Sequence, residues 1–304
     1  MNGYLSFYSA AAAWNIPYIE VVLGAEMAKA GLVEDITVLE RKKRLSGTNR
    51  VKVHLCELEL PSGALVVMKG RLVASPELLF LEFARLLHIH RLILLGLQLC
   101  SHPPGIPAEA ISSVQKIRTF LTKTSRHFGH PRAVRAVKYI GDGSASIMES
   151  IVYMMLTLPH NLGGYALKGA VFNPEIRLKS ESGKYLGQKR CFADLYYQAA
   201  KLLVEYESFS FHSKPAEQSK DAMRSVLLEK QRFEVRQLNT YQLYHAEAFH
   251  DFAHNLASRL SKRMNIRTRK FNEMHKLLRQ LLPDGKQEAD AHAKPEVVPG
   301  AESP

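Results

Sequence analysis

The stretch from Leu78 to Leu99 is the most apolar part of the chain, and it limits the possible folds most strongly. Its length suits a membrane span, which needs about 20 apolar residues. However, the stretch contains five ionisable side chains: Glu82, Arg85, His88, His90 and Arg91. A free-standing transmembrane helix does not accommodate so many. The stretch therefore predicts two helices buried in a protein core, with Ser75 as the cap of the first and Pro76 in its first turn.

A core of this kind agrees with the composition. The chain has 304 residues, of which 46 % are hydrophobic and 23 % charged, as is usual for a globular protein of about two domains. The three cysteines lie far apart without a CxxC motif, which indicates buried thiols in a reducing compartment. The first basic residue is Lys29, so the N-terminus lacks the cationic region of a signal peptide. We expect a cytoplasmic protein without a membrane span.

The positive charge is concentrated in two segments. The formal net charge is +12, although residues 283–304, a tail that we expect to be disordered, contain five acids and two bases. Seven Lys or Arg and no acid lie between residues 110 and 141, and eight lie between residues 259 and 279 against the single acid Glu273. Such segments either form solvated helix faces or bind a polyanion, and two unbalanced segments favour nucleic acid. The candidate contacts are Lys116, Arg118, Arg132, Arg135, Lys138, Arg259, Lys262 and Arg263.

Pattern changes divide the chain into three parts. Residues 1–141 predict a mostly helical region, helical to about residue 45, with a small β hairpin that pairs residues 51–60 with residues 64–68 across a Pro-Ser-Gly turn. Gly141-Asp142-Gly143 marks the boundary. Residues 142–282 predict an α/β domain, and the tail, residues 283–304, follows. The predicted helices of the second part are 146–158, 215–230, 241–263 and 267–282, and its predicted strands are 170–178, 190–197, 201–207 and 233–238.

Acidic residues gather where two of these strands meet. If Ala199 and Ala200 form the centre of a turn, Asp194 lies directly opposite Glu205, and Glu207 shares the face of Glu205. Like charges that oppose each other on a sheet need a cation or raised pKa values. Carboxylates in this arrangement suit Mg²⁺, which supports phosphate chemistry. The alternative is that these acids simply face solvent.

The same residues resemble a known family. Asp194, the sequence Glu205-Tyr206-Glu207, His212, and the pair Asp221 and Arg224 precede the strand at 233–238. This order is similar to the PD-(D/E)XK nuclease core, in particular to an uncharacterised branch related to very-short-patch mismatch-repair endonucleases. The resemblance covers about residues 144–243. It implies a restriction-endonuclease-like mixed sheet flanked by helices, and hydrolysis of phosphodiester bonds in DNA.

The resemblance also implies roles for the single residues. Asp194 and Glu205 would bind Mg²⁺ or Mn²⁺, with the Tyr206 carbonyl as a possible third ligand. Glu207 stands where the superfamily more often has Lys, and a carboxylate cannot donate a hydrogen bond as the Lys ammonium group does. The remaining candidates are Glu149 as a further acid, His212 as a general base or phosphate contact, and Asp221 with Arg224 in support.

Each of these residues also has a simpler interpretation. Ser146 and Glu149 fit a capping box at a helix start. His212 is equally consistent with a surface histidine, and Asp221 with Arg224 forms a plausible surface ion pair.

At the level of the whole chain, the alternative function is a catalytically silent nucleic-acid-binding regulator that keeps the nuclease fold. The segment Ser75-Pro76-Glu77-Leu78 resembles part of the antitoxins of abortive-infection systems, which would imply a protein partner.

A rival motif places His250 and His254 one helical turn apart, as zinc proteases do. An Asp stands where those enzymes have the catalytic Glu, and His245 and His275 are the only loose candidates for a third ligand. An accidental pair on an amphipathic helix is the alternative that we favour.

Overall fold

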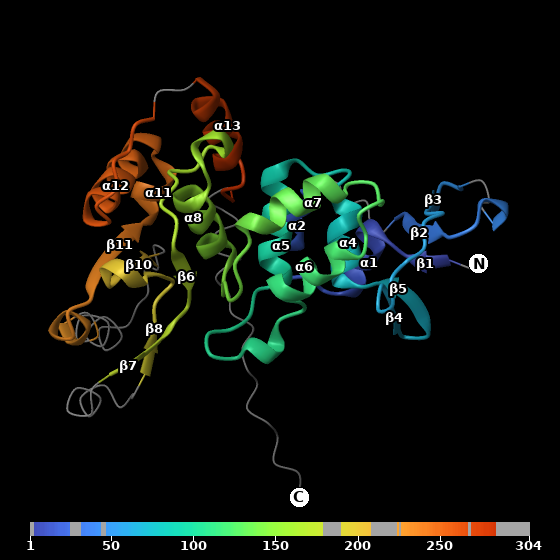
Figure 1. Ribbon diagram of the computed structural model, residues 1–304, viewed down its shortest axis with the longest axis horizontal. Helices are drawn as coiled ribbons and strands as arrows, with labels where there is room; N and C mark the ends of the chain where they lie inside the picture. The colour runs from blue at the N-terminus through green and yellow to red at the C-terminus, as the bar shows by residue number, and fades with distance from the viewer. Residues whose placement is uncertain are drawn as a thin grey trace, which may run out of the picture.

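The computed structural model describes residues 3–24, 32–43, 47–178, 190–207, 224, 226–266 and 269–283. These residues form a mixed α/β structure in which helices occupy the middle of the molecule and β-sheets lie towards its two ends (Figure 1). Two predicted site residues, His212 and Asp221, lie outside the described residues, as do most of the predicted helix 215–230 and nearly all of the tail.

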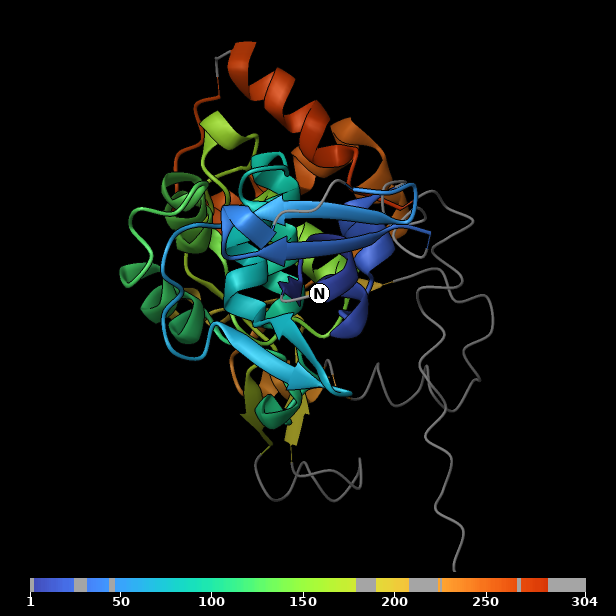
Figure 2. The same cartoon turned by 90° about the vertical axis from the view of Figure 1, so that its right-hand side faces the viewer.

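The N-terminal sheet has five strands in the order β3-β2-β1-β5-β4. Figure 2 shows this sheet in front of the helices that cover its inner side. Strand β1 pairs antiparallel with β2 and parallel with β5, β2 pairs parallel with β3, and β4 pairs antiparallel with β5. The strands are β1 (Gly3–Leu5), β2 (Glu34–Val38), β3 (Val51–Leu55), β4 (Leu65–Met68) and β5 (Arg71–Ala74).

This sheet corrects the prediction of a single small hairpin in the N-terminal region, whereas helices do make up most of the regular structure described there, as predicted. Strands β1 and β2 lie within the segment that was expected to be helical, and β3 does not pair with β4. The hairpin instead joins β4 to β5 through Lys69 and Gly70, whose φ angles are 48° and 76°. The error arose because β1 is too short to show alternation, and its partners are distant in sequence.

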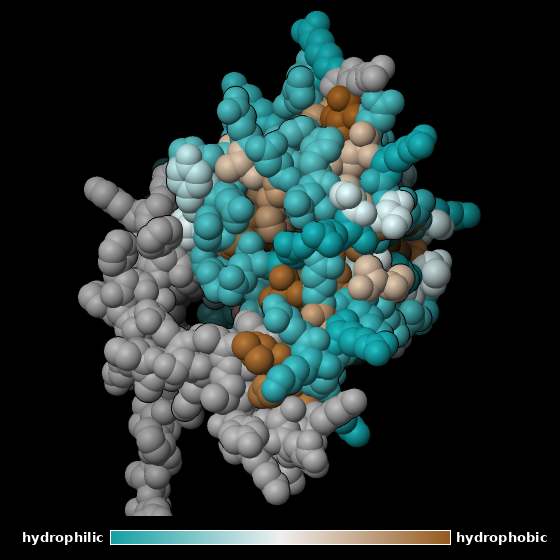
Figure 3. Space-filling view, turned by 90° about the vertical axis from the view of Figure 1, so that its left-hand side faces the viewer, coloured by the Kyte–Doolittle hydropathy of each residue, from teal (hydrophilic) through white to brown (hydrophobic). Residues whose placement is uncertain are grey.

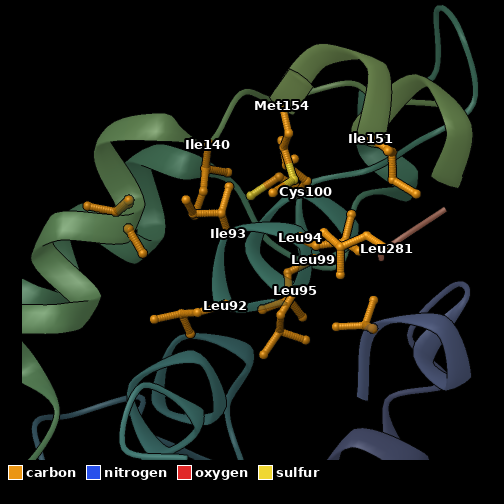
Figure 4. Packing of buried hydrophobic residues seen from close by; sticks show 14 of the residues in the cluster. Leu92, Ile93, Leu94, Leu95, Leu99, Cys100, Ile140, Ile151, Met154 and Leu281 are labelled. Atoms are coloured by element: carbon orange, nitrogen blue, oxygen red, sulfur yellow. The ribbon is translucent and has the colours of Figure 1, made fainter. Parts of the chain in front are cut away.

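Helices fill the centre of the molecule. The Ser75 side chain accepts a hydrogen bond from the Leu78 backbone N–H at 3.2 Å, so the predicted cap of α4 is confirmed. Figure 4 shows Leu92, Leu95 and Leu99 of α5 packed among side chains from other helices. The helices are α1 (Phe7–Ala13), α2 (Ile19–Leu23), α4 (Pro76–Phe83), α5 (Ile89–Leu99), α6 (Val114–Thr122), α7 (His130–Ala136) and α8 (Ile147–Thr157).

The core is continuous across the predicted boundary at residue 141. Side chains of α5 from the N-terminal part and of α8 from the C-terminal part belong to one buried cluster, which extends to Leu281. The Leu78–Leu99 stretch supplies the largest share of its fully buried residues. Within the described part of the chain, no helix combines the length and the apolar character that crossing a membrane requires.

The second sheet positions the candidate site. Its order is β11-β10-β9-β6, in which β9 pairs antiparallel with both β6 and β10, and β11 pairs parallel with β10. Helical residues 226–230 precede β11, as a crossover between parallel strands requires. The strands are β6 (Ala170–Phe172), β9 (Leu195–Tyr197), β10 (Leu202–Glu207) and β11 (Glu234–Asn239), while β7 (Glu175–Arg177) and β8 (Arg190–Phe192) form a separate two-stranded ribbon.

The first of the C-terminal helices packs on β11, whereas the last lies beside α8 (Figure 1). The predicted helix 241–263 is two helices, α11 (Thr240–Tyr244) and α12 (Ala246–Arg259), because His245 between them has an extended backbone. The side chain of Asn239 caps α11 through the Gln242 backbone N–H. Helix α13 (Arg269–Arg279) follows and packs on the turn at residues 160–163.

Candidate functional site

The hairpin of β9 and β10 sets the geometry of the acidic residues. Its register pairs Tyr197 with Leu202 and Leu195 with Val204. One further step along the same register brings Asp194 opposite Glu205, so the predicted turn and register are confirmed. The two faces also differ as expected, because Leu202 and Val204 belong to the main core whereas Leu203 belongs to a second, smaller cluster.

Asp194 directly precedes β9, and its side chain continues the pairing with β10. Its Oδ2 atom accepts a hydrogen bond from the Tyr206 backbone N–H at 2.7 Å. Its carbonyl oxygen accepts another from the Asn173 backbone N–H at 3.2 Å. The Asp194 carboxyl group is therefore held at the end of the central strands rather than free in solvent.

Glu149 approaches Asp194 from the first turn of α8. Ser146 caps this helix by accepting a hydrogen bond from the Glu149 N–H at 3.1 Å, which confirms one half of the predicted capping box. The Glu149 carboxylate accepts hydrogen bonds from the Ala145 N–H at 3.0 Å and from the Asn173 side-chain amide at 2.6 Å. Only 8 % of Glu149 is exposed. Glu149 therefore takes part in the helix cap through its backbone N–H, while its carboxylate is buried.

Asn173, which is not among the predicted site residues, links the two acids. Its side chain binds Glu149 and the Gly143 carbonyl, while its backbone binds Asp194. Its φ angle of 40° lies in the left-handed region, which Asn tolerates better than most residues. The Asn-Pro pair at 173–174, directly after a strand, is a turn signal that would have drawn attention to it.

The pKa values of both acids respond to this arrangement. Burial, and next the nearby charge of Glu149, raise the pKa of Asp194 to about 7, although the Tyr206 N–H and the Arg224 charge act in the opposite direction. Burial also raises the pKa of Glu149, against the hydrogen bonds that it accepts. Buried neighbouring carboxylates with raised pKa values are typical of functional sites.

Glu205 is paired with a cation in the described structure. Its Oε2 atom lies 2.6 Å from the Arg224 Nη2 atom, and only 8 % of Glu205 is exposed. Arg224 also lowers the pKa of Asp194, so its charge reaches both acids. The structure thus brings together four of the predicted site residues: Glu149, Asp194, Glu205 and Arg224.

Glu207 does not join this group. Its side chain is exposed and accepts a hydrogen bond from the Gln237 amide of β11 at 2.7 Å. Its backbone carbonyl accepts a hydrogen bond from the Thr240 hydroxyl at the start of α11. Among the predicted acids that the structure describes, Glu207 is the one that faces solvent.

The basic candidates are all exposed, but three of them also make intramolecular contacts. Arg132 donates to the Leu87 carbonyl, Lys262 donates to the Lys168 carbonyl, and Arg259 forms an ion pair with Glu234. The side of the molecule that carries α12 is mainly hydrophilic (Figure 3). The remaining candidates are Lys116, Arg118, Arg135, Lys138 and Arg263.

The histidine pair on α12 makes contacts of an ordinary structural kind. His250 Nδ1 lies 3.0 Å from the Tyr165 hydroxyl, and the His250 and His254 rings are 4.3 Å apart between centroids. In the residues that the structure describes, no three His, Cys, Asp or Glu side chains are grouped so that they alone form a metal site. The His250 and His254 pair therefore lacks a third ligand there.

Comparison with known proteins returned no matching family model, no matching curated protein and no matching solved structure.

Proposed function

We propose that this chain hydrolyses phosphodiester bonds in DNA, with Mg²⁺ or Mn²⁺, at the site formed by Asp194, Glu149 and Glu205. The observation that carries the proposal is the buried pair of carboxyl groups, Glu149 and Asp194, at the end of a β hairpin with Glu205 opposite. Burying two acids side by side lowers the stability of the fold. Such arrangements are typical of sites that bind a ligand or catalyse a reaction.

The order of the surrounding elements supports the same proposal. Helix α8 is followed by the antiparallel strands β6, β9 and β10, then by helical residues 226–230 and the parallel strand β11. A PD-(D/E)XK domain of the restriction-endonuclease type would use such a mixed sheet with a helix on the side of the first acid. The acids lie on α8, before β9 and on β10, which is the distribution that this family requires.

The donor atoms suit Mg²⁺ or Mn²⁺. Mg²⁺ binds through one or two carboxylates and keeps several waters, so it does not require the group of three His, Cys, Asp or Glu ligands that the described residues lack. Asp194 and Glu205 would hold the ion, with Glu149 beside Asp194. When bound, the ion would polarise an attacking water and stabilise charge on the phosphate.

The remaining residues would orient these acids. Arg224 holds the Glu205 carboxylate in one orientation, and the Tyr206 N–H does the same for Asp194. Asn173 fixes Glu149 relative to the strand that follows Asp194. The exposed cations on α6 and α7 would attract the DNA backbone, as unpaired Lys and Arg do through counterion release.

A plasmid-nicking assay with Mg²⁺ or Mn²⁺ tests the proposal. Asp194→Asn keeps the shape of the side chain but removes its charge, so we expect a loss of at least about hundredfold in the cleavage rate. Asp251→Asn is the matched control, because Asp251 is an exposed aspartate of α12 outside the site. DNA binding in a gel-shift assay should persist in both variants and weaken with added salt.

The outcome also decides between an enzyme and a silent binding protein. The Glu205–Arg224 ion pair and the exposed Glu207 at the usual Lys position favour the silent alternative. Salt-dependent DNA binding without cleavage by the wild type, in either metal, would replace the nuclease proposal by that of a nucleic-acid-binding regulator. Equal cleavage by Asp194→Asn and wild type would remove the site assignment.

A further inference from the structure

A pocket lies in the N-terminal half, and none of its lining residues belongs to the candidate site. It has a volume of about 370 Å³ and is enclosed by the ends of strands β1 to β3, by helix α4 and by the loop at residues 126–128 between α6 and α7. This volume falls within the range of small-molecule sites, about 300–1,000 Å³. The residues that matter for its chemistry are Phe7, His54, Glu82, Arg85, Arg126 and Phe128.

Aromatic rings contribute two parts of the pocket wall. The Phe7 and His54 rings lie 4.3 Å apart between centroids at an angle of 39°. Phe128 is 74 % exposed, and the guanidinium carbon of Arg85 lies 5.3 Å from its ring centroid. A phenylalanine so exposed at the rim of a pocket gains favourable contacts when a flat ring stacks on it.

The charge of the pocket is positive. Arg85 and Arg126 are exposed, and neither forms an ion pair with another residue in the described parts of the chain. Their planar guanidinium groups match the oxygens of a phosphate. The one exposed acid of the lining, Glu57, offsets only one of these two charges.

Buried polar groups form the floor of the pocket. Glu82 accepts hydrogen bonds from the Tyr4 hydroxyl at 3.0 Å and from the Phe7 N–H at 3.1 Å. Burial raises the pKa of Glu82 to about 8, so this carboxyl is largely neutral at pH 7 and does not repel an anion. Asp35 binds His54 Nε2 at 2.7 Å, which holds the imidazole in place with Nδ1 as its remaining polar atom.

We propose that this pocket binds a nucleoside monophosphate, with its base against the aromatic wall and its phosphate at Arg85 and Arg126. The exposed ring of Phe128 explains a planar base, because every nucleobase has a π-face that stacks on aromatic side chains, whereas Phe7 is only 3 % exposed and belongs to the buried part of the wall. The two guanidinium groups explain a phosphate rather than a carboxylate, because a phosphate presents more oxygens and more charge. The Nδ1 atom of His54, whose Nε2 atom binds Asp35, supplies a hydrogen-bond partner for the edge of the base.

Isothermal titration calorimetry on the full chain tests the proposal, with EDTA present so that no divalent metal takes part. The probes are AMP, GMP, CMP and UMP, compared with adenosine, inorganic phosphate and benzoate. We expect saturable one-to-one binding of at least one nucleotide, with adenosine and phosphate each at least about tenfold weaker, because each lacks half of the contacts.

Two substitutions and a matched control locate the site. Arg126→Ala should weaken nucleotide binding about tenfold without lowering the unfolding temperature, because Arg126 is exposed. Phe128→Ala should weaken it as well. Lys123→Ala removes one positive charge from the end of α6 outside the pocket and should leave the affinity unchanged.

Several results would overturn the proposal. They are the absence of saturable binding by all four nucleotides at millimolar concentration, equal affinity for benzoate, and unchanged affinity in Arg126→Ala. Loss of nucleotide binding in Asp194→Asn would assign the ligand to the candidate nuclease site instead. Retained binding in Asp194→Asn, with loss in Arg126→Ala, would support a pocket that is independent of the proposed nuclease function.

Discussion

Asn173 connects Glu149 to Asp194, so that a helix and a strand present two carboxyl groups to each other. The charge of Glu149 contributes to the raised pKa of Asp194, which is about 7 instead of 3.8. The folded chain therefore binds more protons at Asp194 than the unfolded chain between these two pH values. The contribution of the Asp194 carboxyl group to the free energy of unfolding is greatest at low pH and is lost as the pH rises towards 7.

Asp194→Asn should remove this pH dependence. The amide oxygen still accepts the Tyr206 N–H but does not ionise, so we expect the variant to be more stable than wild type at pH 8 by about 2 kcal/mol. At pH 4 the difference should nearly vanish. Urea unfolding at both pH values, in EDTA, measures it, with Asp251→Asn as the control. Equal pH slopes in wild type and Asp194→Asn would contradict the raised pKa.

The ion pair between Glu205 and Arg224 should contribute to stability. Arg224→Ala removes the guanidinium group that lies 2.6 Å from a carboxylate that is only 8 % exposed, and we expect a loss of about 2 kcal/mol. Glu205→Gln in the Arg224→Ala background should recover part of that loss. A double-mutant cycle by chemical unfolding gives the coupling energy, and strictly additive effects would show that the two side chains do not interact in solution.

Gly163 should be essential for the packing of α13. Its φ is +80°, and an added Cβ atom would lie 2.4 Å from the backbone N of His275. Gly63 has a similar φ of +81°, but a Cβ atom added there would have no atom within 4 Å. Comparing the two glycines therefore separates the cost of backbone strain from the cost of a steric clash. We expect Gly63→Ala to cost about 1 kcal/mol and Gly163→Ala about 3 kcal/mol or more. Thermal unfolding measures both, and equal losses would contradict the close packing.

Buried histidines should make the fold sensitive to acid. His90 of α5 contacts the Leu162 carbonyl at 2.8 Å through Nε2, and His275 of α13 contacts the Gly163 carbonyl at 2.7 Å through Nδ1. Burial lowers the pKa of His90 to about 4. The unfolded chain, with a value near 6.5, binds more protons between these limits, so this group destabilises the fold progressively as the pH falls from 6.5 to 4.

His90→Gln removes the titrating group while keeping a hydrogen-bond donor. Between pH 7 and pH 4, the free energy of unfolding should decrease by about 1–3 kcal/mol less in the variant than in wild type. Because Asp194 acts in the opposite direction over this range, wild type and variant are compared at each pH by urea unfolding. The control is His254→Gln, which replaces an exposed histidine of α12. An unchanged acid response in His90→Gln would argue against a buried neutral imidazole.

Local patterns in the sequence determined much of the helical core and of the hairpin. The Ser75 and Ser146 caps, the burial of Leu78 to Leu99 and the register that opposes Asp194 to Glu205 all follow from residues close together in the chain. Capping, periodicity and a short turn act over a few residues. They are therefore visible without knowledge of the rest of the fold.

Tertiary structure alone decided the features that join distant segments. The parallel pairing of β1 with β5, the Asn173 link between Glu149 and Asp194, and the contact of Arg224 with Glu205 each bring together residues from different parts of the chain. Short strands carry little periodicity, and hydrogen bonds between remote residues leave no spacing rule. The sequence by itself thus determined which acids lie on neighbouring strands, while packing decided which of them became buried, paired and shifted in pKa.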